Sequence, residues 1–106
     1  MLQNFRTYNL AKEFYRDCEK LSCKAHIKDQ LSRASLSVVL NLAEGSGKST
    51  QKDRARFYRI SPGSFRECQS ILDLIDRPEL LKKYDFLGIC LYNLHKYTLN
   101  PRKPSN

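Results

Sequence analysis

Residues 27–50 read IKDQLSRASLSVVLNLAEGSGKST, and this stretch decides the fold. At 3.6 residues per turn, its main apolar stripe falls within about 100° of one side of a helix, as in a core-facing helix. The members of the stripe are Ile27, Leu31, Ala34, Val38, Asn41 and Leu42. The periodicity therefore predicts a helix from about residue 25 to residue 45.

A second apolar group occupies the opposite side of the same helix. Its members are Leu36, Val39, Leu40 and Ala43. A small bundle covers only one face of a helix fully, so a helix that is apolar on two faces needs a further partner. We expect this second face to contact another subunit of a homo-oligomer.

The helix is expected to end at Gly45-Ser46-Gly47, because glycine adopts the left-handed cap conformation without a Cβ penalty. Ser49 or Thr50 can cap the next helix, with Asp53 in a capping-box-like position three residues after Thr50. Gly47-Lys48-Ser49 also resembles the end of a phosphate-binding loop. That interpretation fails, because Leu42 occupies the position where the motif requires its first glycine and no βαβ pattern is present.

The next helix is predicted from about residue 51 to residue 76 and has an apolar and a basic side. The apolar side comprises Phe57, Ile60, Ser61, Ser64, Cys68, Ile71, Leu72 and Ile75. The opposite side, which we call the basic ridge, comprises Lys48, Lys52, Arg56, Arg59 and Arg66. Only Asp53 is acidic between its two ends, so few intrahelical pairs can neutralise it. The ridge is either a solvated face or a surface for nucleic acid, with little base reading because no aromatic residue is expected on that side.

Pro62 is expected to interrupt this helix, because proline removes one backbone hydrogen bond and clashes with the preceding turn. We expect a kink over residues 58–62. Gly63 beside it would permit a close helix approach or a bend.

Two further helices complete the chain. The first spans about residues 7–21, and the last carries an apolar stripe from Leu80 to Thr98. Four helices with short links and no strand pattern predict an all-α, antiparallel up-down four-helix bundle over residues 1–99. Residues 100–106 contain no large apolar side chain and are expected to form a disordered tail.

The composition favours an acidic partner. Nineteen Lys and Arg against 11 Asp and Glu give a formal charge of +8, which suits nucleic acid without specifying it. No run of eighteen apolar residues exists, and the N-terminus lacks a signal-peptide core, so we expect a cytoplasmic protein without a membrane contact. The four cysteines show no Cys-x-x-Cys spacing, which fits a reducing compartment.

No residue pattern indicates catalysis or a cofactor. Cys23 and His26 offer two metal ligands, too few for a structural zinc site. The chain has no Glu-x-x-His motif, and His26 and His95 stand apart from any nucleophile in the sequence. We therefore expect no metal, no cofactor and no enzymatic activity.

Two blocks carry a resemblance to a known family. Residues 30–45 (QLSRASLSVVLNLAEG) and 57–67 (FYRISPGSFRE) resemble the signature of the four-helix-bundle proteins encoded in 23S rRNA intervening sequences. That group includes the accessory variability determinant of diversity-generating retroelements. Residues 8–11 and 14–16 are similar too, whereas Pro62 replaces the usual alanine or leucine. The matching residues are Arg33, Asn41, Glu44, Gly45, Gly63, Ser64, Arg66 and Glu67.

The resemblance implies a ring-shaped homopentamer with a basic surface for nucleic acid, RNA being the expected kind, and no established catalytic activity. Glu44, Gly45, Gly63 and Ser64 are interpreted as structural, and we expect Arg33 and Glu44 each to pair with another helix or subunit. Three functions are left open: a nucleic-acid-binding oligomer, which is favoured, an adaptor for a protein such as a reverse transcriptase, and an enzyme, which is disfavoured.

Overall fold

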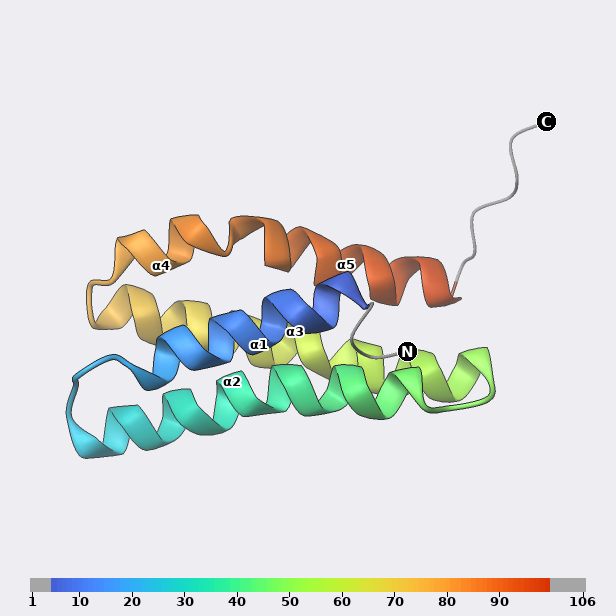
Figure 1. Ribbon diagram of the computed structural model, residues 1–106, viewed down its shortest axis with the longest axis horizontal. Coiled ribbons are helices and arrows are strands. Elements are labelled where there is room, and N and C mark those ends of the chain that lie inside the picture. Colours follow the sequence, from blue (N-terminus) through green and yellow to red (C-terminus); the bar gives the residue numbers. More distant parts are fainter. Residues whose placement is uncertain (1–4, 100–106) are drawn as a thin grey trace.

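The structure is a computed structural model that describes residues 5–99, and no strand occurs among them. Helices α4 and α5 follow one another almost in line and form the fourth rod of the bundle (Figure 1). Successive rods run in opposite directions, which confirms the predicted all-α four-helix bundle. The expected tail at residues 100–106 lies outside the described residues. The helices are α1 (Arg6–Glu19), α2 (Ala25–Ser46), α3 (Gln51–Leu74), α4 (Pro78–Lys83) and α5 (Asp85–Leu99).

The core forms where the predicted stripe of α2 meets the other rods. Leu31, Val38 and Leu42 of this stripe are all at most 1% exposed. Phe14 of α1 packs edge-on against Phe65 of α3 and against Tyr84, with ring centroids 5.1 and 5.0 Å away. These edge-to-face aromatic contacts join three rods at one level of the bundle.

The end of α2 differs from the expected left-handed glycine cap. The helix continues to Ser46, and its C-cap Gly47 has a φ of −87°, in the right-handed region. No glycine among residues 5–99 has a positive φ, so the predicted cap is wrong. Gly45 serves close packing instead, because a Cβ placed on it would lie 2.5 Å from Cε1 of Tyr58 on α3.

Helix α3 begins as predicted and continues through its proline. The backbone N–H of Asp53 donates to Thr50 Oγ1 at 3.1 Å, which confirms the capping residue. The helix then runs unbroken through Pro62, so the predicted interruption is wrong. Packing maintains the helix here: Tyr58, Ser61 and Phe65 are buried on one side, and Ser61 Oγ donates to the Val38 carbonyl of α2 at 3.0 Å.

Asp76 makes the turn between α3 and α4. It has a φ of 58°, in the left-handed region. Its N–H donates to the Asp73 carbonyl at 3.1 Å, and the Arg77 N–H donates to the Leu72 carbonyl at 2.9 Å. This pair of bonds is a Schellman motif, which satisfies carbonyls that the end of the helix would otherwise leave without partners.

A polar contact ties α1 to the fourth rod. Oδ2 of Asp17 accepts hydrogen bonds from Lys83 Nζ at 2.8 Å and from the Tyr84 hydroxyl at 2.5 Å. These two bonds, Lys83 first, hold the pKa of Asp17 below its ordinary value of 3.8. Burial first, and then the same carboxylate, raise the pKa of Tyr84. The carboxylate is therefore bound in its charged form.

We predict that Asp17 makes stability fall in acid. Because its pKa is lowered from 3.8 on folding, the unfolded chain binds the proton more readily, so the contribution is complete above that value and is lost as the pH falls through the folded pKa. Urea unfolding across this pH range should show a smaller loss of unfolding free energy in Asp17→Asn than in the parent protein. Tyr84→Phe removes one of the two hydrogen bonds to the carboxylate, so it should lower the free energy of unfolding by about 1 kcal/mol near neutral pH. Identical acid profiles for Asp17→Asn and the parent would contradict the assignment.

We also predict opposite effects for alanine at two helical glycines. Gly45→Ala should lower the free energy of unfolding by about 1–3 kcal/mol, because the new methyl group overlaps the ring of Tyr58 and forces it out of its packed position. Gly63→Ala is the matched control. Its Cβ would meet nothing within 4 Å, so better helix propensity should stabilise the monomer by about 0.5–1 kcal/mol. Equal signs in denaturant melts would refute the packing role of Gly45.

Candidate nucleic-acid interface

The basic ridge occupies the outer side of α3. Lys52, Arg56, Arg59 and Arg66 are all exposed. None of the four has a carboxylate within salt-bridge distance in the part of the chain that the structure describes. Their charge is therefore available to an external anion, apart from screening by solvent ions.

Lys48 differs from the other members of the ridge. Its Nζ lies 3.6 Å from Glu44 Oε2, a pair at i and i+4 across the end of α2. Within one copy of the chain, Glu44 therefore pairs with a lysine one turn away and not with another helix, and the expected pairing with another subunit stays a prediction. Arg33 is exposed on α2 and has no carboxylate partner among residues 5–99.

An aromatic ring lies beside the ridge, contrary to the sequence prediction. Phe57 is half-buried, with Lys48 Nζ 5.1 Å and Arg56 Cζ 5.0 Å from its ring centroid. The helical wheel places Phe57 on the apolar side, but both cationic side chains are long enough to fold back over it. Two of the five cations are thus positioned by one ring.

Small polar residues position the ridge against α2. Ser64 Oγ lies 2.8 Å from Ser37 Oγ, and Asn41 Nδ2 donates to the Ser37 carbonyl at 2.9 Å and to its Oγ at 3.1 Å. Asn41 and Ser64 therefore belong to a polar contact between α2 and α3. Gly63 is exposed and has open space around it, so the close helix approach expected there is absent within this chain.

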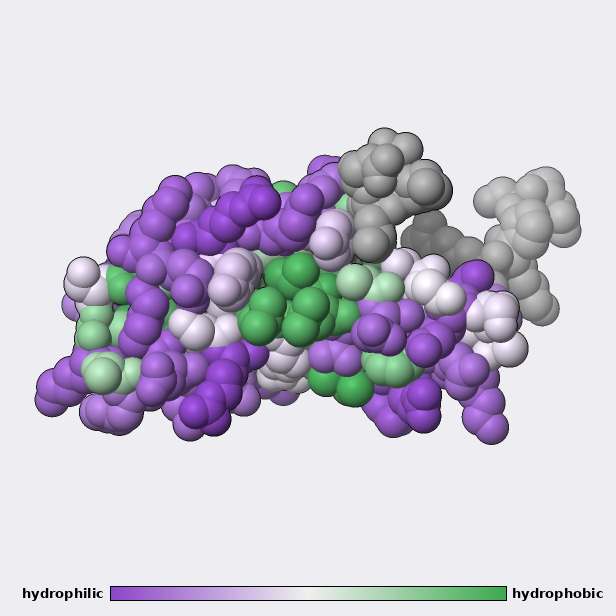
Figure 2. Space-filling view, turned by 60° about the horizontal axis from the view of Figure 1, so that its bottom comes forward, coloured by the Kyte–Doolittle hydropathy of each residue, from purple (hydrophilic) through white to green (hydrophobic). Residues whose placement is uncertain are grey.

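An apolar patch lies next to the ridge. Leu36 and Leu40 of α2 are 40% and 52% exposed, and Ile60 of α3 is 43% exposed. Figure 2 shows hydrophobic surface gathered near the middle of this face. Val39 is only 7% exposed and belongs to the core, so its expected place on the uncovered face is wrong. The buried side of α2 is thus wider than the predicted stripe and includes Val39. Ala43 is half-buried.

A second apolar surface, the α5 row, was missed from the sequence. Phe86, Ile89 and Tyr92 are 46%, 51% and 60% exposed along α5. The sequence prediction followed the apolar period that includes the buried residues Leu87 and Leu91, and it did not distinguish the exposed apolar residues beside them. Helix α5 lies diagonally across the bundle from α2 (Figure 1), so the α5 row is a different surface from the leucines of the apolar patch. Ile89 and Tyr92 of the row line a groove beside α3.

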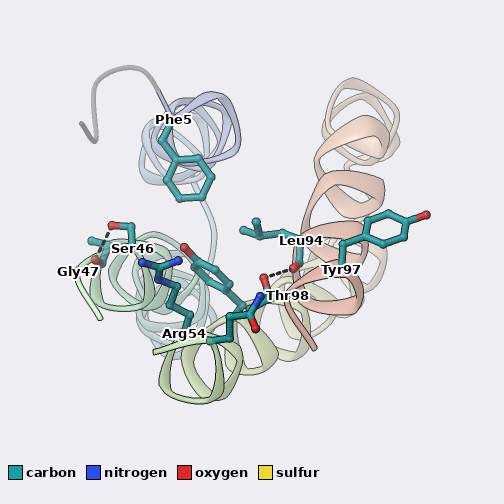
Figure 3. A pocket seen from close by; sticks show the side chains of 10 residues that line it. Phe5, Ser46, Gly47, Arg54, Leu94, Tyr97 and Thr98 are labelled. Atoms are coloured by element: carbon teal, nitrogen blue, oxygen red, sulfur yellow. Dashed lines mark hydrogen bonds between the residues drawn. The ribbon is translucent and has the colours of Figure 1, made fainter. Parts of the chain in front are cut away.

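Sequence analysis also missed a cleft of about 880 Å³ at the end of the bundle where α2 ends and α3 begins (Figure 3). Four separate segments contribute to it, so no local sequence pattern could predict it. It is lined by Phe5, Ala43, Ser46, Gly47, Gln51, Arg54, Tyr58, Leu94, Tyr97 and Thr98.

The possible metal ligands and the buried thiols are the other candidate groups. Residues 5–99 contain no cluster of three or more His, Cys, Asp or Glu side chains able to hold a metal ion. Burial raises the pKa of Cys18 to about 12 and raises that of Cys68 as well, so both thiols stay protonated. Among the same residues, no helix combines the length and apolar character that crossing a bilayer requires.

Comparison with known proteins gives one match. The model of a protein family described as 23S rRNA-intervening sequence protein matches residues 4–91, most of the chain. Neither a curated protein nor a solved structure matches the chain.

Proposed function

The chain belongs to the family of 23S rRNA-intervening sequence proteins, and from this premise we propose that it is a non-enzymatic, cytoplasmic homo-oligomer that binds nucleic acid, RNA above all, through the basic ridge. The observation that carries the proposal is that four members of the basic ridge, all exposed on α3, have no carboxylate partner among residues 5–99. Four free cysteines fit a reducing compartment.

The spacing of the ridge suits a polyanion. From Lys52 to Arg66 the helix rises roughly 21 Å at 1.5 Å per residue, a length over which a nucleic-acid strand presents several phosphates. Arg56 and Arg59 lie between these ends. Phosphate contacts fix position and supply affinity without reading sequence, so we expect weak sequence preference from the ridge itself.

The two exposed apolar surfaces support oligomerisation. An interface with two different sides repeats around a closed ring, whereas an interface with two identical sides stops at a dimer. The apolar patch lies on α2 and α3 and the α5 row lies on α5, so they are different surfaces, and the patch of one copy can pack against the α5 row of the next. The pentameric number comes from the family resemblance. A ring would present the basic ridge several times and increase the overall avidity for a long strand.

The α5 row also favours a second candidate function. Exposed aromatic and aliphatic side chains are typical of protein-binding surfaces, so the protein could instead be an adaptor for a partner such as a reverse transcriptase, without direct nucleic-acid contact. Gene neighbourhood separates the two: an adjoining reverse transcriptase gene supports the adaptor, and an isolated reading frame within an rRNA gene supports the nucleic-acid binder.

We predict that reversing two charges on the ridge weakens binding. Arg56→Glu with Arg59→Glu should lower the affinity for RNA at least about tenfold near 0.1 M salt and flatten the salt dependence, because fewer counterions are released. Fluorescence anisotropy with labelled RNA and DNA measures both. The matched control is Arg16→Glu with Lys82→Glu, which makes the same charge change at exposed sites on α1 and α4. Equal losses in both double variants, or no binding by folded parent protein at low salt, would refute the proposal.

The ring makes a specific prediction for mixed variants. Leu40→Glu removes the patch and Ile89→Glu removes the α5 row, so each variant alone should be monomeric. An equal mixture should form dimers but nothing larger, because only one intact interface per pair remains. Native mass spectrometry measures this, with Leu74→Glu, at a 77% exposed site outside both surfaces, as the control that keeps the parent assembly. A monomeric parent protein, or full assembly of either single variant, would contradict the ring.

A further inference from the structure

The cleft joins segments that are distant in the sequence but share one end of the bundle. Phe5 precedes α1, Ser46 ends α2 with Gly47 as its C-cap, and Arg54 lies in the first turn of α3, with the last turns of α5 opposite them (Figure 3). Its volume of about 880 Å³ lies in the range of small-molecule sites. Two of its lining residues, Gly47 and Gln51, are the chain neighbours of Lys48 and Lys52, which start the basic ridge.

Tyr58 is the buried polar group of this cleft. The residue is 6% exposed and lines the cleft, yet its hydroxyl has no hydrogen-bond partner among the described residues. The hydroxyl oxygen itself is not one of the fully buried unpartnered atoms of residues 5–99, so it has access to the cleft and can donate to a ligand atom there. Burial raises the pKa of Tyr58, so the hydroxyl remains a donor at neutral pH.

Arg54 supplies a positive charge to the same cleft. Its Nε donates to the Lys48 carbonyl at 2.8 Å, which fixes the guanidinium plane. No carboxylate pairs with it in the described chain, so its terminal N–H groups are available to an anion. A planar guanidinium with free N–H groups matches the oxygens of a phosphate better than an ammonium does.

The remaining walls suit a flat heteroaromatic ring with polar edges. The rings of Phe5 and Tyr58 meet edge-on with centroids 6.4 Å apart, and Leu94 adds apolar surface. Ser46 Oγ and Thr98 Oγ1 donate to carbonyls of their own helices at 2.9 and 2.6 Å. Their hydroxyl oxygens can still accept hydrogen bonds from the N–H groups of a base.

We propose that this cleft binds one unstacked nucleotide of a single-stranded nucleic acid, with the base against the aromatic wall and the adjoining phosphate on Arg54. The inference rests on the proposed function and adds a class of substrate to it. The strand leaving the cleft reaches the basic ridge directly, because both share the start of α3. A duplex keeps its bases stacked and paired, so it can use the ridge but not the cleft.

Three cleft variants test the proposal. Arg54→Gln removes the charge, Tyr58→Phe removes only the hydroxyl, and Leu94→Trp fills the cleft. Each should weaken binding of a single-stranded oligonucleotide, by at least about fivefold for Arg54→Gln and Leu94→Trp, and leave duplex affinity within about twofold. The matched control Arg66→Gln, on the ridge, should weaken both forms alike. Thermal melts confirm that each variant is folded, and a 2-aminopurine base in the single strand reports the environment of the bound base.

The outcomes separate the cleft from the ridge. Equal affinity of the parent protein for single strand and duplex, with no effect of the cleft variants, would overturn the nucleotide site and leave the ridge intact. Equal losses for both forms in Arg54→Gln would make Arg54 one more ridge cation and likewise overturn the site. If Leu94→Trp binds single strand as the parent does, the base does not enter the cleft. Absence of any binding by the parent would reject the proposed function and the cleft together.

Discussion

The close contact between α2 and α3 is the constraint on which the rest of the structure depends. These two helices form the most extensive pair in the bundle. Gly45 lets the ring of Tyr58 press against α2, and Ser61 donates to the Val38 carbonyl in the middle of the pair. Small residues at these points bring the helices together without an empty space between them. The contact also sets the rotation of α3, and so directs its basic side outward.

The sequence predicts much of this arrangement because the signals are local. The stripe from Leu31 to Leu42 follows the helical period, and the cap at Thr50 depends on a residue only three positions away. Two local rules gave wrong predictions, because tertiary packing determines the backbone at these positions. Gly45 was assigned a cap because glycine permits one, whereas its lack of a Cβ is used by a ring on the next helix. Pro62 was expected to interrupt α3 with a kink over residues 58–62. The helix is continuous there, and buried residues lie on both sides of the proline, whereas the kink itself stays a prediction.

The same distinction between local signals and tertiary contacts applies to the functional surfaces. The basic ridge could be predicted because Lys52, Arg56 and Arg59 repeat at helical spacing on one helix. The role of Phe57 could not, since a wheel diagram ignores the reach of long side chains that fold over a neighbouring ring. The cleft could not be predicted either, because residues 5 and 98 meet only in the folded chain.

Tyr58 links packing to the cleft. Its ring fills the space left by Gly45, while the residue also lines the cleft, so one side chain serves the core and the proposed site. A larger residue at position 45 would displace the ring and alter the cleft without touching any ligand. If the proposed site binds a nucleotide, a substitution at position 45 changes stability and binding together. Gly45 belongs to the family motif as a packing residue, and its effect on the proposed site would act only through the position of the Tyr58 ring.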